Sequence, residues 1–352
     1  MIPKPLNLRV AFFGSDHFSL VSLKRLVLMH QQSPVISSID VFTRSIKPTG
    51  RSLKTYVDVP IGDFAQKAGL PLFRVDSAQQ ITQFCDRKYD VAVAVSFGKL
   101  IPGSFLSSLR YGGLNVHPSL LPKFSGSSPI QYALMKDCKS TGVTVQTLHP
   151  TKFDHGDILR QSSAIEIGPH EPFSELRDRL AVVGADLLQS VLDSGDLVHP
   201  SVISSPETYS LAPKIPASLS EIDWTTMTSR QICRLADALG PLFSYKAVDI
   251  VKKKKSIVEP AKVILDEFLE LESYQGELPL HNPGDFSLLE DKFVVKTVNS
   301  FVSIGKLKYQ CCGYEDPKTF MVHLKLRAGP TSHSFQASPK MLALRTGKSG
   351  LN

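Results

Sequence analysis

The spacing of apolar and polar positions alternates between two periods over the first half of the chain. Short apolar segments bounded by glycine, proline or polar residues are typical of strands, and apolar residues three and four positions apart are typical of helices. Strands are predicted at 8–14, 39–45, 89–102 and 141–150, and helices at 17–28, 61–71, 128–137 and 172–195. Strands that alternate with helices predict an α/β fold with a doubly wound, mostly parallel sheet.

A different pattern begins near residue 198. Residues 198–216 are rich in proline and serine and show no clear period, so we interpret them as a linker. Beyond it, a helix is predicted at 228–241 and short strands at 245–254, 261–265, 291–298, 300–309 and 321–326. This spacing predicts a small, OB-like β-barrel, although a sandwich would share it. The predicted domains are therefore 1–197 and 217–352.

Basic residues are in excess and unevenly distributed. The formal net charge is +7, and from Lys292 onward ten Lys or Arg face two acidic residues, a local excess of +8. Residues 43–54 form a second basic segment, and four consecutive lysines occupy 252–255. Such segments form either solvated faces or a surface for a polyanion, here one large enough to contact both domains.

Several classes of protein are disfavoured by what the sequence lacks. It contains no run of about 18 apolar residues, so we expect no membrane span. Its five cysteines show no CxxC or Cys/His ligand spacing, which predicts reduced thiols and no metal. GxGxxG and Walker A motifs are also missing, which argues against a common nucleotide site. The first predicted strand leaves little room for a targeting peptide, so we expect either that none is needed or that it was removed.

Asn115 and His117 are the first candidates for chemistry. They lie two positions apart at the end of an apolar segment, "LNVH", so in a strand both side chains project from one face. At the carboxyl end of a parallel sheet this face opens into the crevice where such folds bind ligands. Pro118 and Pro122 restrict the following turn.

Asp154 lies on the loop that follows the next predicted strand. A neighbouring strand can bring this loop beside the first pair, where a carboxylate would orient the imidazole. An amide donor suits a developing oxyanion. Asn115, His117 and Asp154 together therefore predict acyl transfer without a covalent intermediate. Two alternatives stay open: Asn115 and His117 are ordinary surface residues, or Asp157 is the carboxylate that matters.

Ordered motifs along the first two thirds of the chain resemble those of the folate-dependent formyltransferases. They are "FFGSDHF", "GGLNVHPSLLP", "SSPIQYAL", "TGVTVQTL" and "FDHGDIL", with "TYSLAPKI" and "IDW" near the linker. The length, the linker motif and the basic C-terminal domain are similar to those of the members that act on methionyl-tRNA. The wording of several motifs resembles fungal mitochondrial members most closely.

The resemblance implies a role for individual residues. Asn115, His117 and Asp154 match the catalytic trio of the family, and 10-formyltetrahydrofolate would be the co-substrate, with no metal. Residues implied in folate binding are Phe97, Gly98, Leu100, Ser119, Leu120, Leu121 and Pro122. Residues implied in tRNA binding are Lys47, Arg51, Lys54, Lys252 and Lys253, with Arg51 on a loop that would enter the acceptor stem.

The function expected from the resemblance is formylation of initiator methionyl-tRNA by a monomer in the mitochondrial matrix. One alternative is formyl transfer to a small amine, such as glycinamide ribonucleotide or an amino sugar nucleotide. That enzyme would need neither the basic domain nor the Arg51 loop. A second alternative is an RNA-binding module with an inactive core, against which the intact Asn115, His117 and Asp154 argue.

Overall fold

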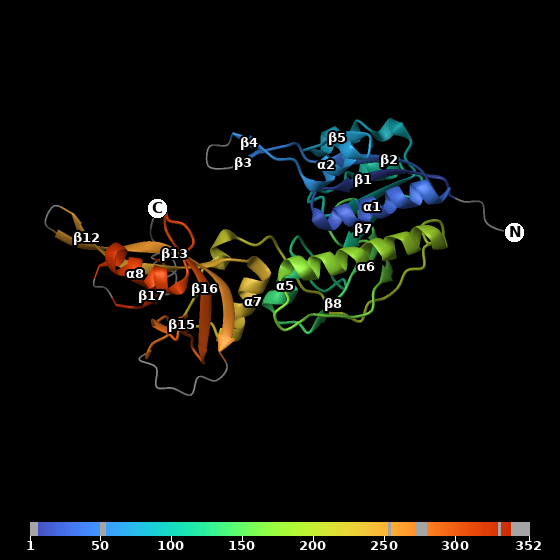
Figure 1. Cartoon of the computed structure of the whole chain (residues 1–352). Helices are drawn as coiled ribbons and strands as arrows, with labels where there is room; N and C mark the ends of the chain where they lie inside the picture. Colours follow the sequence, from blue (N-terminus) through green and yellow to red (C-terminus); the bar gives the residue numbers. More distant parts are fainter. Residues whose placement is uncertain (1–5, 50–53, 253–254, 272–279, 330–331, 339–352) are drawn as a thin grey trace. The chain divides into compact units, whose positions relative to one another are not determined.

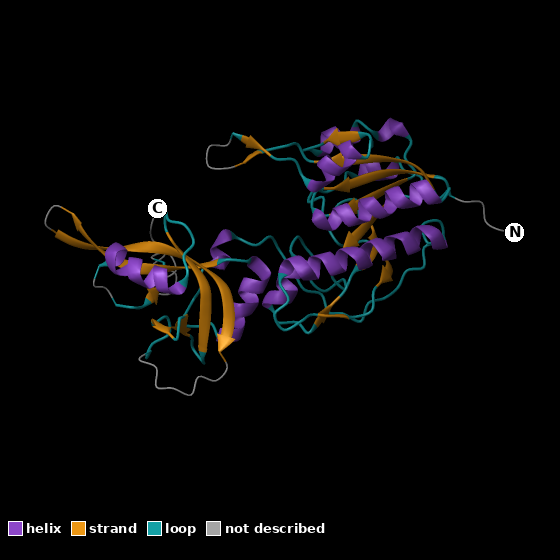
Figure 2. Ribbon diagram, viewed as in Figure 1, coloured by secondary structure: helices purple, strands orange, loops and turns teal. Residues whose placement is uncertain are grey.

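The computed structural model describes residues 6–49, 54–252, 255–271, 280–329 and 332–338. The chain forms two compact units, each with its own hydrophobic core (Figure 1). Unit 1 comprises Met1–Ala133, Cys138–Gly168 and Ser174–Lys214, and unit 2 comprises Leu134–Asp137, Pro169–Phe173 and Ile215–Asn352. Unit 1 combines helices with a mostly parallel sheet, whereas unit 2 is mainly antiparallel sheet (Figure 2).

Unit 1 is built on a seven-stranded sheet in the order β10-β9-β7-β6-β1-β2-β5. The strands from β7 to β5 are parallel, and β9 and β10 extend one edge in antiparallel fashion. Their bounds are β1 (Leu8–Gly14), β2 (Ile36–Thr43), β5 (Leu72–Arg74), β6 (Val91–Val95), β7 (Gly113–His117), β9 (Thr144–Thr147) and β10 (Ile158–Gln161). The predicted doubly wound, mostly parallel α/β sheet is therefore confirmed.

Helices cover both faces of this sheet. On one face α1 (His17–Gln32) and α6 (Phe173–Ser194) lie side by side (Figure 1), joined by an ion pair of 2.6 Å between Arg25 and Asp186. On the other face α3 (Ala78–Thr82) and α4 (Gly103–Ser107) pack into an aromatic core cluster. Among the described residues no helix has both the length and the apolar character needed to cross a membrane.

The remaining short elements connect these layers. They are β3 (Pro48–Thr49), β4 (Thr55–Tyr56), α2 (Pro60–Lys67), the 3-10 helix η1 (Cys85–Arg87), α5 (Pro129–Met135), β8 (Ser140–Thr141), β11 (Ile165–Glu166) and the 3-10 helix η2 (Ala217–Ser220). The basic segment 43–54 contains β3 and ends directly before β4, and these two strands pair with Pro48 opposite Tyr56. The predicted loop therefore overlaps the short hairpin that these two strands form.

The predicted linker is mostly an ordered part of unit 1, because its backbone is hydrogen-bonded there. Ala212 N donates to Ser125 O at 2.7 Å, and Ser128 N donates to Ala212 O at 3.0 Å. Gly126 has φ +128, and a Cβ at this position would lie 2.5 Å from Ala212 O. We call residues 198–214 the strap. The last passage of the chain from unit 1 to unit 2 follows Lys214, within the predicted linker.

Unit 2 is an antiparallel barrel with strand order β14-β15-β16-β13-β12-β17. Its two edge strands meet through a bridge between Asp285 and Ser334, where Phe335 N donates to Gly284 O at 2.9 Å. The bounds are β12 (Leu242–Lys252), β13 (Lys255–Leu271), β14 (Phe286–Leu289), β15 (Lys292–Lys296), β16 (Phe301–Tyr309) and β17 (Phe335–Gln336). The predicted small barrel is therefore confirmed over the sandwich.

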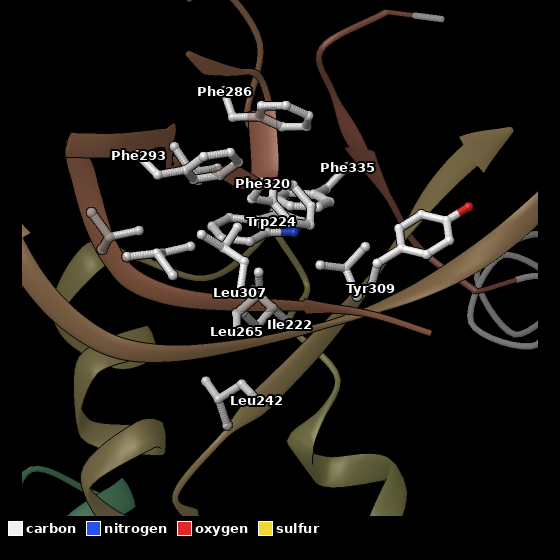
Figure 3. Packing of buried hydrophobic residues seen from close by; sticks show 14 of the residues in the cluster. Ile222, Trp224, Leu242, Leu265, Phe286, Phe293, Leu307, Tyr309, Phe320 and Phe335 are labelled. Carbon is white, nitrogen blue, oxygen red and sulfur yellow. The ribbon is translucent and has the colours of Figure 1, made fainter. Parts of the chain in front are cut away.

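The barrel core packs a group of aromatic side chains against a larger number of aliphatic ones (Figure 3). Trp224 stacks on Phe335 with ring centroids 5.7 Å apart, and its indole Nε1 donates to Ser244 Oγ at 2.9 Å. Because this hydrogen bond satisfies the one polar atom of the indole, the ring is buried without an unpaired donor. Helix α7 (Ser229–Leu239) adds Ile232 and Leu235 to the core.

The predicted strand at 321–326 is wrong, because these residues belong to helix α8 (Pro317–Ala328). Asp316 caps the helix by accepting a hydrogen bond from Thr319 N at 3.1 Å, and Pro317 occupies its first turn. Phe320, Leu324 and Ala328 are buried at the four-residue spacing of a helix. The alternation in "MVHLKL" matched a strand over six residues only, a window too short to separate the two periods.

Two arginines of α7 explain why short segments of the N-terminal half belong to unit 2. Arg230 Nη2 lies 2.7 Å from Asp137 Oδ1, and Arg230 Nη1 donates to Pro169 O at 2.7 Å. The guanidinium of Arg234 is buried and lies 2.9 Å from Asp237 Oδ2. Hydrogen bonds of this kind fix the segments around Asp137 and Pro169 to α7.

We expect Leu265→Ala to lower the free energy of unfolding of unit 2 by about 2–5 kcal/mol, because Leu265 is fully buried in the barrel. Leu269→Ala on the same strand is the matched control, since Leu269 is 51% exposed. Urea unfolding followed by tryptophan fluorescence measures this unit, because Trp224 is the single tryptophan. Equal losses in the two variants would contradict the packing of β13.

A pH-dependent ion pair connects Arg327 of α8 to Glu315, on the loop between β16 and α8. Arg327 Nη1 and Nη2 lie 2.8 and 2.7 Å from the two Glu315 oxygens, and these hydrogen bonds lower the pKa of Glu315. A carboxyl group whose pKa is lower in the folded than in the unfolded protein stabilises the fold at a pH above its unfolded pKa. This stabilisation is lost as the pH falls through the pKa of the folded protein.

We therefore expect Arg327→Met to cost about 1 kcal/mol at pH 7. The difference from wild type should shrink to nothing in acid, once Glu315 is protonated. Urea titrations between pH 7 and pH 3 measure it, and Lys318→Met is the control because the Lys318–Asp291 pair is mostly exposed. A cost that stays constant with pH would rule out this ion pair as its source.

Candidate active site

One row of residues in register across the unit 1 sheet leads from the core to the candidate site. Phe13 on β1 pairs with Phe42 on β2 and with Ala94 on β6; Ala94 pairs with Asn115 on β7, and Asn115 with Gln146 on β9. Side chains of directly paired residues project from the same face. Asn115 and Gln146 therefore share the face of the aromatic core cluster, and His117 joins them two positions along β7.

Asp154 completes the cluster, as the sequence predicted. Its Oδ1 lies 3.3 Å from Asn115 Nδ2 and 3.4 Å from His117 Nδ1, and its Oδ2 accepts a hydrogen bond of 2.7 Å from Gly126 N. Asp154 has φ +55, a left-handed conformation that costs free energy outside glycine. The structure thus brings Asn115, His117 and Asp154 together, while their catalytic role stays a prediction.

His117 lies between two acceptors. Its Nδ1 faces Asp154, its Nε2 lies 3.1 Å from the carbonyl oxygen of Phe124, and the residue is only 5% exposed. A neutral imidazole has one N–H, so it satisfies only one of these acceptors, whereas the imidazolium satisfies both. Both ring nitrogens of His117 therefore have an acceptor within reach.

The two other candidates on this loop lie apart from the cluster. Asp157 is exposed, and its backbone N donates to Thr147 Oγ1 at 2.8 Å. His155 is exposed, and its Nδ1 lies 2.5 Å from Phe153 O. Of the two carboxylates that the sequence left open, only Asp154 reaches His117.

A cavity of about 510 Å³ opens beside the cluster. Asn115, His117 and Asp154 line it together with the three predicted folate residues, Phe97, Gly98 and Leu100. Phe97 is held by an edge-to-face contact with Phe13, at a centroid distance of 5.2 Å. At the rim Lys99 Nζ lies 3.0 Å from Asp76 Oδ1. Hydrogen bonds from Ser45 and Lys99 lower the pKa of Asp76 to about 2.

The four residues predicted to form the folate turn lie elsewhere. Ser119, Leu120, Leu121 and Pro122 do not line this cavity. They form a tight turn behind His117, in which Leu121 N donates to Thr144 Oγ1 at 3.0 Å and Ser119 Oγ donates to Lys123 O at 2.6 Å. These residues thus pack behind His117, and their role in folate binding stays a prediction.

Leu121 and Pro122 line a second cavity, of about 420 Å³. Ser204, Ser205 and Tyr209 of the strap form its opposite wall. Gln146 and Asp154 are the residues that line both cavities. These two side chains therefore form the boundary between the two spaces.

Gln146 was missed by the sequence analysis. Its Nε2 lies 3.4 Å from Asp154 Oδ1, and among the described residues no donor reaches its buried Oε1. A buried carbonyl oxygen without a donor costs about 1–3 kcal/mol. The available signal was a long polar side chain within the otherwise buried strand 144–147.

The predicted tRNA-binding residues are only partly described. Lys47 and Lys54 are both exposed, Lys47 directly before β3 and Lys54 directly before β4. Lys252 is the last residue of β12, while Arg51 and Lys253 lie outside the described residues. Throughout the described part of the chain, no group of three or more His, Cys, Asp or Glu side chains is arranged to hold a metal ion.

The sequence of this chain is similar to those of known proteins. The sequence profile described as Formyl transferase matches residues 8–192. The mitochondrial methionyl-tRNA formyltransferase of Saccharomyces cerevisiae is 31% identical over 94% of this chain and 92% of its own length. The protein of the same name from Rattus norvegicus is 31% identical over 81% of this chain and 72% of its own.

Solved structures show the same fold. HypX from Aquifex aeolicus in complex with tetrahydrofolic acid matches with a TM-score of 0.53 at 15% identity, over 91% of this chain and 48% of HypX. The chain thus spans about half the length of HypX. WlaRD, a sugar 3N-formyl transferase, matches with a TM-score of 0.56 at 12% identity, over 87% of this chain and 98% of WlaRD.

The structural likeness, at such low identity, concerns the fold alone. The sequence likeness goes further, because the profile covers more than half of the chain and the yeast relative nearly all of it. The chain belongs to the formyl transferase family.

Proposed function

We propose that this protein transfers the formyl group of 10-formyltetrahydrofolate to the amino group of methionyl-tRNA. The observation that carries the proposal is the 31% identity to yeast mitochondrial methionyl-tRNA formyltransferase over 94% of this chain, a span that includes both units. The site supports the reaction type, since an amide, an imidazole and a carboxylate meet beside a cavity of about 510 Å³. WlaRD, a sugar 3N-formyl transferase, also matches over 87% of this chain, but at 12% identity, so the sequence likeness favours methionyl-tRNA over a small amine.

The cavity fits a folate. It is large enough for a flat bicyclic ring, and its inner wall is apolar at Phe97, Leu100 and Ile101. Gly98 has φ +74, so the backbone turns sharply between Phe97 and Lys99. Such a turn exposes backbone groups that could bind the polar edge of a pterin. The HypX structure with tetrahydrofolic acid shares this fold, which is consistent with a folate at this place.

Each polar group of the cluster has a role in the proposed reaction. The amine attacks the formyl carbon, the bond from this carbon to the folate nitrogen breaks, and the proton that the amine loses is returned to that nitrogen. Asn115 Nδ2 donates to the negative charge that develops on the formyl oxygen, and the His117 imidazolium donates to it through Nε2–H, which exchanges the Phe124 carbonyl for this oxygen. Asp154 holds the imidazolium in place and helps to carry the proton.

Two finer assignments concern the location of the protein and its choice of tRNA. Relatives from yeast and rat carry the word mitochondrial in their names, which supports a mitochondrial location, and the matrix is where organellar translation would use formylated methionyl-tRNA. Preference for an initiator tRNA rests on the Arg51 loop. Opening a weak end base pair costs less than opening a strong one, so a loop inserted there would favour a tRNA with a weak end.

We expect His117→Ala to lower kcat for formylation of methionyl-tRNA by at least about 100-fold, because it removes a donor to the oxyanion. Purified protein, charged tRNA and 10-formyltetrahydrofolate suffice for the measurement. His199→Ala is the control, since His199 is exposed and outside both cavities. Near wild-type turnover in a folded His117→Ala protein would exclude this residue from the reaction.

Arg51→Ala should raise KM for methionyl-tRNA roughly tenfold while leaving KM for 10-formyltetrahydrofolate unchanged, because a lost contact to a phosphate or base weakens only RNA binding. Steady-state kinetics with each substrate varied in turn separates the two constants. Lys24→Ala, which changes an exposed lysine of α1, is the control. An equal loss of folate affinity would place Arg51 in the folate site instead.

A further inference from the structure

Gln146 occupies a position where the fold has no need of a polar side chain. It is 1% exposed on β9, and the preceding residue of that strand, Val145, is fully buried. Asn115 on β7 and Ile158 on β10 are its partners in register. Because its side chain lies in the interior of unit 1, an apolar residue of similar length would fill the same space.

The amide nitrogen of Gln146 points to the centre of the site. Three donors converge on Asp154 Oδ1: Asn115 Nδ2 at 3.3 Å, His117 Nδ1 at 3.4 Å and Gln146 Nε2 at 3.4 Å. A carboxylate held by several donors keeps one orientation. Such distances are long for hydrogen bonds and commonly shorten once the substrates are bound.

The amide oxygen of the same side chain has no donor among the described residues, as noted above. Reversing the amide would bring Oε1 against the Asp154 carboxylate and leave the nitrogen without an acceptor, so the orientation shown is the better of the two. The unpaired Oε1 of Gln146 therefore lowers the stability of unit 1, whereas its Nε2 supports Asp154. A residue that costs stability in this way is typical of functional sites.

We propose that Gln146 is a positioning residue for formyl transfer, which acts through Asp154. Its Nε2–H holds Asp154 Oδ1 at the point where Asn115 and His117 also meet it, so that the imidazolium keeps its direction toward the reacting carbonyl. The inference deepens the proposed function and rests on it. Replacing Gln146 with an apolar residue should therefore lower kcat without lowering the stability of unit 1.

Gln146→Met tests this directly, because methionine has nearly the shape of glutamine and neither donates nor leaves a carbonyl unpaired. We expect kcat for methionyl-tRNA to fall about tenfold or more, with KM for both substrates within twofold of wild type. The midpoint of urea unfolding of unit 1 should be unchanged or higher. Hydrogen exchange of peptides that contain β7 and β9 measures this unit separately from the barrel.

Two further variants sharpen the comparison. Gln146→Glu keeps the length and an acceptor oxygen but sets a second carboxylate against Asp154, so kcat should fall at least as far as in Gln146→Met. Gln189→Met makes the same chemical change on α6, where the amide contacts Arg25 and Asp193 at the surface. It should leave kcat unchanged.

The outcomes separate this inference from the proposed function. Wild-type turnover in the same assay tests the function itself. A Gln146→Met protein that keeps wild-type kcat, or whose unit 1 unfolds at lower urea, would show that Gln146 serves the fold and would overturn the inference. The stability comparison needs no turnover, so it decides this point even if the wild-type protein fails to formylate methionyl-tRNA.

Discussion

The register of the unit 1 sheet is the constraint on which the candidate site depends. One row of paired residues crosses five neighbouring strands, in the order Phe42, Phe13, Ala94, Asn115 and Gln146. The aromatic core and the polar site therefore share one face of the sheet. Slipping one strand by one residue would turn its side chains to the opposite face. The apolar packing of Phe13 and Phe42 thus determines, several strands away, which way Asn115 projects.

The cluster is then completed by loops rather than by strands. Asp154 adopts a left-handed backbone conformation on the loop between β9 and β10, and Gly126 donates its N–H to the other carboxylate oxygen. Gly126 is in turn held against the strap, where Ala212 leaves no room for a side chain. A segment distant in sequence from Asn115 therefore supports the carboxylate that faces His117, which connects the strap to the chemistry of the site.

The sequence was most informative where a single period governs a long segment or where polar residues interrupt an apolar strand. The α/β order of unit 1 and the meeting of Asn115, His117 and Asp154 were predicted on these grounds. The predictions differ from the structure where contacts outside the local pattern matter. "MVHLKL" lies in a helix that Asp316 caps. The strap is ordered by hydrogen bonds to Ser125 and Ser128. Gln146 could not be recognised because its pairing with Asn115 requires an antiparallel β9, which no local pattern specifies.

The division of the chain into units has a consequence for dissecting the protein. The polypeptide passes from one unit to the other near residues 133, 137, 168 and 173 before the final passage after Lys214. A fragment cut at residue 216 would retain Asp137 and the carbonyl of Pro169 but not Arg230, which binds both. One cut of the chain therefore cannot separate unit 1 from unit 2. A fragment that ends at residue 216 still carries two short segments of unit 2 without the arginine that binds them.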